Sequence, residues 1–150
     1  MKRIVGIVVV FLLISCQTEI KKEDLNKLNG YWEIKNVTLP DGEEKEYKVN
    51  ETIDFFELKN AVGFRQKVMP QFDGKFKTNG IKENIKIVAK EDKFFVEYKT
   101  VYGKWQEEII ALEDSLLVLK NQQKMEYEYK RHIPFCHFQS FYAHSHASCR

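Results

Sequence analysis

The chain has 150 residues, of which 24 are basic and 22 acidic, so its formal net charge is +2. This length suffices for one domain with a single hydrophobic core but not for two. The near balance of charge excludes the strongly basic surface that is typical of nucleic-acid-binding domains.

The N-terminal segment has the composition of an export signal. Lys2 and Arg3 precede an uninterrupted apolar run from Ile4 to Ile14, as in a secretory leader. The run is shorter than the roughly 20 residues that a membrane-spanning helix needs. We therefore expect residues 1–15 to be a removable signal peptide. Its removal leaves 22 basic and 22 acidic residues, so the remaining chain has no net charge.

Leu13-Ile14-Ser15-Cys16 resembles the bacterial lipobox. The resemblance implies cleavage before Cys16, a diacylglycerol on its thiol and an acyl chain such as palmitate on the new amino terminus. An ordinary signal peptide that contains a cysteine is the alternative. Gln17 follows Cys16, and by resemblance to the sorting rule of many Gram-negative lipoproteins this implies the outer membrane of the cell envelope, on its periplasmic or surface face. Two or more acyl chains hold a protein to a membrane far better than one.

The segment after Cys16 is polar, with Ile20, Leu25 and Leu28 as its only apolar residues up to Asn29. We expect residues 16–27 to be the lipidated cysteine and a tether, with one helical turn over 23–27. The domain itself is expected over 28–131.

From Leu28 onward the sequence alternates with period 2. In Gly30-Tyr31-Trp32-Glu33-Ile34-Lys35 the residues Trp32 and Ile34 share one face. Turn signals recur every 8–12 residues, which is typical of an all-β sandwich or barrel. The pattern predicts an antiparallel up-and-down meander of about eight to ten strands closed into a barrel, because closure removes both sheet edges. After the first strand, the expected strands are 52–59, 61–68, 75–78, 84–89, 94–100, 102–112, 115–120 and 124–131.

Two details of side-chain direction follow from the alternation. A bulge is expected at Phe55-Phe56, where the alternation breaks. In the next strand Phe64 is expected to face inward, and Arg65 and Lys67 to face solvent. The orientation of Trp105 is undetermined, since neither face of its strand is cleanly apolar.

Gly30-Tyr31-Trp32 matches the G-x-W motif of the lipocalin superfamily, and the chain over 28–131 resembles lipocalin-like lipoproteins of bacterial envelopes. The resemblance implies that Trp32 closes the floor of a lipocalin-like barrel and stacks on an arginine of the last strand. Arg131 is the candidate partner. Two departures from larger lipocalins are the lack of a helix after the last strand and of a pair of core cysteines.

An eight-stranded barrel either fills with side chains or holds one small ligand. Several aromatic residues are expected to point inward, and their tyrosine content favours a partly polar cavity, because buried hydroxyls need partners. We therefore expect a membrane-anchored protein that binds a small apolar or amphipathic ligand. The alternative is a barrel with a filled core that serves as a non-enzymatic interaction or structural module of the envelope. The candidate ligand-binding residues are Phe64, Phe76, Phe94, Tyr98, Tyr127 and Tyr129.

Catalytic signals are missing from the sequence. It contains no Ser/His/Asp arrangement, no glycine-rich phosphate loop and no spaced carboxylate dyad, and no histidine precedes His132. Glu107 and Glu108 cannot act as a pair, because adjacent strand residues point to opposite faces. We therefore predict neither an enzyme nor a cofactor.

Residues 132–150 differ from the rest of the chain, since they lack Lys, Asp and Glu. We expect an atypical, disordered extension, because the abrupt loss of lysine is typical of another reading frame. Two alternatives stay open: a Cys136–Cys149 disulfide, which an oxidising compartment allows, and a metal site. The residues available to a metal are Cys136, His137, His144, His146 and Cys149.

Overall fold

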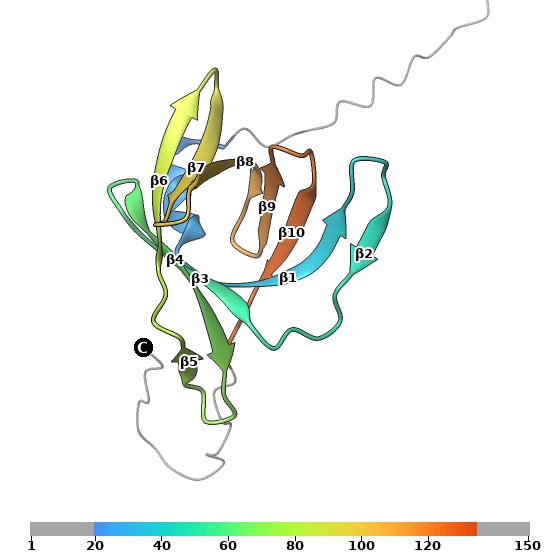
Figure 1. Ribbon diagram of the computed structural model, residues 1–150, viewed down its shortest axis with the longest axis vertical. Helices are drawn as coiled ribbons and strands as arrows, with labels where there is room; N and C mark the ends of the chain where they lie inside the picture. The colour runs from blue at the N-terminus through green and yellow to red at the C-terminus, as the bar shows by residue number, and fades with distance from the viewer. Residues whose placement is uncertain (1–19, 135–150) are drawn as a thin grey trace, which may run out of the picture.

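Ten β-strands and one short helix make up residues 20–134, the part of the chain that the computed structural model describes (Figure 1). The helix, η1 (Lys22–Leu28), is a 3-10 helix, and it is neither long nor apolar enough to cross a membrane. The strands are β1 (Gly30–Thr38), β2 (Glu44–Glu46), β3 (Ile53–Lys59), β4 (Val62–Pro70), β5 (Phe76–Thr78), β6 (Glu83–Lys90), β7 (Lys93–Lys99), β8 (Lys104–Leu112), β9 (Leu116–Asn121) and β10 (Glu126–Arg131).

Several predictions concern residues outside this range. The signal peptide and the lipidation site lie before it, and the proposed disulfide and metal ligands lie after it. These residues are 1–15, Cys16, Cys136, His137, His144, His146 and Cys149.

Eight of the strands form a closed barrel. They pair in the order β1, β3, β4, β6, β7, β8, β9 and β10, every pair is antiparallel, and β10 pairs back onto β1. The predicted all-β antiparallel meander of about eight to ten strands closed into a barrel is thus confirmed. The two short strands are additions to the wall: β2 pairs with the second half of β1, and β5 with the end of β4. The sequence did not predict β2, since its three residues are all exposed and none is apolar.

Successive strands run in opposite directions, so the connections alternate between two ends of the barrel. We call the end that receives η1 the near end; it carries the turns β3–β4, β6–β7 and β8–β9. The far end carries the connections 39–52, 71–82, 100–103 and 122–125. Two near-end turns have two residues at positive φ, Asn60-Ala61 and Glu91-Asp92, as in type I′ hairpins whose twist matches that of the strands.

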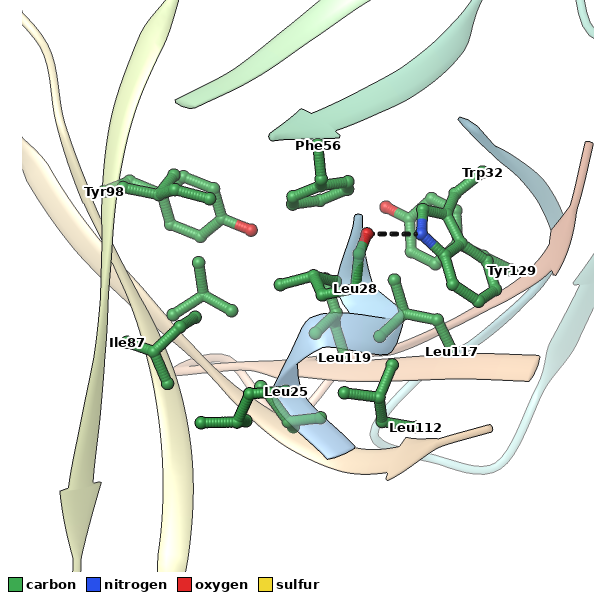
Figure 2. Packing of buried hydrophobic residues seen from close by; sticks show 13 residues of the cluster. Leu25, Leu28, Trp32, Phe56, Ile87, Tyr98, Leu112, Leu117, Leu119 and Tyr129 are labelled. Carbon is green, nitrogen blue, oxygen red and sulfur yellow. Dashed lines mark hydrogen bonds between the residues drawn. The ribbon is translucent and has the colours of Figure 1, made fainter. Parts of the chain in front are cut away.

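Helix η1 inserts into the barrel. Leu25 and Leu28 lie one turn apart, both are buried, and they pack in one cluster with Leu117 and Leu119 (Figure 2). The indole nitrogen of Trp32 donates a buried hydrogen bond of 2.8 Å to the carbonyl oxygen of Leu28. The segment expected to be a tether therefore contributes to the core, because its few apolar residues lie on one side of the helix.

The strand register decides which side chains face the lumen. Trp32 lies opposite Asp54, and Asp54 opposite Lys67. Phe56, two residues after Asp54 on the same face of β3, lies opposite Arg65. Because Trp32 and Phe56 are core residues, Arg65 also faces the lumen, and the prediction that it faces solvent is wrong. Lys67 lies on the same face of β4 towards the far end, where its side chain is 56% exposed.

The expected bulge at Phe55-Phe56 is also wrong, since β3 pairs with β4 from Ile53 to Lys59 without a shift in register. Both phenylalanines are accommodated because both faces of β3 are covered: Phe56 packs in the core, and Phe55 lies outside with its ring 4.7 Å from that of Tyr31. Register shifts occur instead at 34–36 in β1 and at 109–111 in β8.

Candidate functional site

The near end is closed by Trp32 and Arg131, which the structure brings together as directly opposed residues of β1 and β10. The guanidinium carbon lies 4.1 Å from the centre of the Trp32 ring. Arg131 also donates to the carbonyl oxygens of Asn29 at 2.8 Å and Lys27 at 2.5 Å, and to that of Asp114. One side chain thus joins η1, the start of β1, the β8–β9 turn and the last strand.

Gly30 is required by this arrangement. Its φ of +118° lies in a region that side-chain-bearing residues rarely adopt. A Cβ at this position would lie 2.8 Å from Nη1 of Arg131. The glycine of the G-x-W motif therefore makes room for the arginine that covers the tryptophan.

The six candidate ligand-binding residues divide into two groups. Tyr98 and Tyr129 are buried in the core cluster inside the barrel, and Phe94 and Tyr127 pack against that cluster. Phe64 and Phe76 lie outside the barrel, so their predicted inward orientation is wrong. The ring of Phe64 lies beneath Nζ of Lys82 at 3.6 Å, because its neighbour Arg65 takes the lumenal face. Phe76 belongs to β5, which is not a barrel strand, and stacks on Tyr31 at 4.0 Å.

The lumen also contains charged groups, which we call the lumenal ion cluster: Asp54, Arg65, Lys67, Glu83 and Glu107. Nε of Arg65 lies 2.6 Å from Glu83 and 3.9 Å from Asp54, and Nη1 lies 3.9 Å from Glu107. Lys67 donates to the second oxygen of Asp54 at 2.8 Å. Buried charges persist only when they are paired and hydrogen-bonded, and Arg65 is the group that compensates three carboxylates.

Aromatic side chains pack around this cluster. The ring of Tyr98 lies 4.4 Å from the guanidinium carbon of Arg65 and stacks on Trp105 at 4.9 Å, which settles the orientation of Trp105 toward the lumen. The Tyr98 hydroxyl donates to Glu107 at 2.7 Å. Burial raises the pKa of Glu107, although the Tyr98 hydrogen bond and the charge of Arg65 oppose the shift. Burial also raises the pKa of Tyr98 and of Tyr129, so both remain neutral phenols.

One lumenal oxygen lacks a hydrogen-bond partner within residues 20–134. Oδ1 of Asp54 is buried and accepts no hydrogen bond from any described residue. The Tyr129 hydroxyl lies in the field of Asp54, Glu107 and Arg65. The far half of the lumen is therefore polar, while its near half is filled by η1 and the apolar core.

An open space lies outside the barrel wall. We call it the outer groove: a pocket of about 680 Å³ between the 48–51 loop, the β4–β5 hairpin and the outer face of β1. Ile53 is buried beneath it, and Val49 and Phe72 extend from its two sides into solvent. Pockets of 300–1,000 Å³ with mostly apolar walls and a few polar groups are typical of small-molecule sites. Its lining consists of Glu33, Lys48, Val49, Asn50, Glu51, Ile53, Met69, Pro70, Gln71, Phe72 and His132.

One side of the outer groove is polar. Asn50 donates to Oε1 of Glu33 at 3.1 Å and to the carbonyl oxygen of Ile34 at 2.8 Å, which fixes the loop. Oε2 of Glu33 lies 3.6 Å from Nδ1 of His132 and 3.5 Å from Nζ of Lys130. Burial alone would raise the pKa of Glu33, but the Asn50 hydrogen bond and the Lys130 charge lower it below its ordinary value. Glu33 is therefore an anion held at the edge of an apolar pocket.

His132 corrects a predicted boundary. The sequence pattern assigns it to the atypical extension, but its amide donates to the carbonyl oxygen of Tyr31 at 2.9 Å and so continues the pairing of β10 with β1. The alternation in the sequence missed the outer groove because the groove is built from loops and from the outer face of the sheet. Within residues 20–134 no group of three or more His, Cys, Asp or Glu side chains is placed to hold a metal ion.

No protein-family model and no curated protein sequence matches this chain. Among solved structures it is similar to a lipocalin-like protein from Bacteroides uniformis, at 12% identity and a TM-score of 0.45, over 71% of this chain and 99% of that one. It is also similar to an uncharacterized protein from Bacteroides eggerthii, at 12% identity and a TM-score of 0.44, over 70% of this chain and 99% of that one. Apocrustacyanin C1 gives 13% and 0.44, with 75% of this chain and 64% of that one covered. The closed barrel is established by the strand pairing of this chain itself.

Proposed function

We propose that this protein is a non-catalytic binding protein that holds a small amphipathic molecule in the outer groove. The observation that carries the proposal is the combination of apolar walls with the anionic, partly buried Glu33 in one pocket of about 680 Å³. The apolar part of the ligand would pack on Val49, Met69 and Phe72. Its polar end, a hydrogen-bond donor, would contact Glu33.

We further propose that the protein works while tethered to the outer membrane by acyl chains on Cys16. The tether and its outer-membrane location rest on the sequence of residues 1–17. Mass spectrometry of the protein extracted from membranes is expected to show an acylated N-terminal Cys16. A Cys16→Ser variant is expected to lose the acyl mass and to leave the membrane fraction; an unacylated mature protein would contradict the anchor.

Ligand binding is tested with the chain 17–150, which retains every described strand and the whole described core. Two fluorescent probes are titrated, a dansyl alkylamine and a dansyl fatty acid, and the amine is expected to bind more tightly because Glu33 is an anion. A Val49→Ser/Phe72→Ser double variant should bind the amine at least tenfold more weakly, since each buried apolar side chain contributes about 1.5–3 kcal/mol.

Val62→Ser is the matched control, because Val62 is exposed on β4 and does not line the outer groove. Glu33→Gln should remove the preference for the amine while leaving apolar binding in place. Equal affinities of the double variant, the control and the unchanged chain would exclude the outer groove as the site.

A lumenal site is the second candidate, and the unpartnered Oδ1 of Asp54 favours it. A ligand there would contact the predicted residues Phe94, Tyr98, Tyr127 and Tyr129 and place a donor on Asp54. Tyr129→Phe removes only a hydroxyl, so it separates the two candidates. A loss of probe affinity in Tyr129→Phe, with none in Val49→Ser/Phe72→Ser, would assign the ligand to the lumen.

A further inference from the structure

The two ends of the barrel differ in the apolar side chains that they expose. Four large apolar residues project from the far-end connections 71–82 and 100–103: Phe72 is 99% exposed, Ile81 65%, Val101 92% and Tyr102 97%. The near-end turns contain mainly polar residues, including Asn60, Glu91, Asp92 and Asp114. Exposed apolar side chains concentrated on one part of a surface indicate an interaction site.

The same part of the surface is basic. The far-end segments 71–82, 99–104 and 122–125 contain six lysines and one acid, Asp73, which gives a net charge of +5. All six lysines are exposed. They are Lys75, Lys77, Lys82, Lys99, Lys104 and Lys124.

Of these six lysines, Lys75 lies 3.3 Å from Asp73. Two others, Lys99 and Lys104, differ in their pairing from several lysines at the near end. Lys27, Lys90 and Lys93 each lie within 3.0 Å of a carboxylate. Within residues 20–134, by contrast, Lys99 and Lys104 form no ion pair, although they lie directly opposite each other on β7 and β8. Like charges in directly opposed strand positions repel each other. An external anionic partner would relieve this repulsion.

We propose that these three segments form a contact surface for an anionic lipid bilayer. Lysines above an anionic membrane each contribute about 1 kcal/mol of attraction, while apolar side chains beside them enter the headgroup region. The fourth far-end connection, 39–52, has five acidic and two basic residues. An anionic bilayer would repel this side, so the barrel approaches the membrane with the segments 71–82, 99–104 and 122–125.

This surface lies at the end of the barrel opposite Ile20, and it shares only Gln71 and Phe72 with the outer groove. Ile20, the first described residue, lines a pocket with the near-end residues Glu91 and Asp92, at the opposite end of the barrel. Val101, Tyr102 and Lys124 do not line the outer groove. The variants used to test this surface change none of the residues that line the outer groove, so failure of this proposal is distinguishable from failure of the proposed function.

The test uses the unacylated chain 17–150 and co-sedimentation with two kinds of vesicle. One kind is pure phosphatidylcholine, and the other contains equal parts of phosphatidylcholine and phosphatidylglycerol. We expect sedimentation with the mixed vesicles, and release as salt is added, because salt screens exposed charges. Binding to neither kind of vesicle would overturn the proposal and would assign the surface to a protein partner.

Two variants examine the charged and the apolar contributions. Lys99→Gln/Lys104→Gln/Lys124→Gln should lower the partition coefficient on mixed vesicles on the order of 100-fold, since each lysine contributes about fivefold. Val101→Ser/Tyr102→Ser should lower it at least tenfold. The matched controls are Lys22→Gln/Lys59→Gln/Lys130→Gln and Ile133→Ser, which change exposed residues outside these segments and outside the pocket that Lys99 and Lys104 line. Equal binding by the far-end variants and the controls would refute the proposed surface.

Discussion

Arg131 covers the face of Trp32 at 4.1 Å and donates hydrogen bonds to three main-chain carbonyls that come from η1, Asn29 and the β8–β9 turn. A lysine has the same charge but no planar fork with which to reach all three acceptors. We expect Arg131→Lys to lower the free energy of unfolding by about 2–3 kcal/mol, as measured by urea denaturation. Lys130→Gln changes the exposed neighbour and should stay within about 0.5 kcal/mol of the unchanged protein. Equal values for the two variants would contradict this account of the near end.

Gly30 faces the same guanidinium group. Gly30→Ala introduces a Cβ 2.8 Å from Nη1 of Arg131 at a φ of +118°. We expect the free energy of unfolding to fall by about 1–3 kcal/mol. Gly103→Ala is the control, because a Cβ there would meet no atom within 4 Å beyond its chain neighbours. Thermal unfolding followed by circular dichroism compares the two; a stable Gly30→Ala protein would show that the close approach is not needed.

Arg65 compensates three carboxylates in the lumen, and its side chain is largely buried. Arg65→Met removes that charge and leaves Asp54, Glu83 and Glu107 facing one another. Loss of one partner from a buried ionic network typically destabilises a protein by about 3–5 kcal/mol.

Lys67→Met is the comparison for this prediction, since Lys67 pairs with the same Asp54 from a side chain that is 56% exposed. Exposed pairs contribute only about 0–1 kcal/mol. In urea denaturation, Arg65→Met should therefore lower the midpoint far more than Lys67→Met does. A mild effect of Arg65→Met would mean that the carboxylates are hydrated or protonated without it.

Burial raises the pKa of Glu107 above its ordinary value of 4.5. Over the pH range just above 4.5 the folded state therefore binds more protons at this site than the unfolded state does. The contribution of Glu107 to the free energy of unfolding is therefore complete below that range, and it is lost as the pH rises through the raised pKa. Glu107→Gln should remove this loss, so its stability relative to the unchanged protein should increase from pH 4.5 towards neutrality. Glu97→Gln, which changes a carboxylate on the neighbouring strand, should show no such trend. Parallel pH profiles of Glu107→Gln and the unchanged protein would contradict the predicted effect of Glu107.

Alternation and turn residues predicted the barrel strands, because strand period and hairpin chemistry are local properties. The opposed pair Trp32 and Arg131 was predicted from the resemblance of Gly30-Tyr31-Trp32 to the G-x-W motif, with Arg131 chosen for its position in the last strand. The direction of Phe64 could not be predicted this way, since a rule that turns apolar residues inward fails where Arg65 is compensated by carboxylates from β3, β6 and β8. Those partners are distant in sequence. The outer groove was missed for the same reason, because loops 48–51 and 69–72 meet only in the folded chain.

The closure of the barrel through β1 and β10 has a consequence for how the chain folds. Arg131 donates to a carbonyl oxygen 102 residues earlier in the sequence. Contacts between such distant residues slow folding, because most of the chain must be ordered before they form. Until β10 has paired with β1 and β9, the edges of those two strands remain open to pairing with other chains. We therefore expect folding to wait for the last strand, and a chain that ends before residue 126 to aggregate instead of forming a smaller barrel.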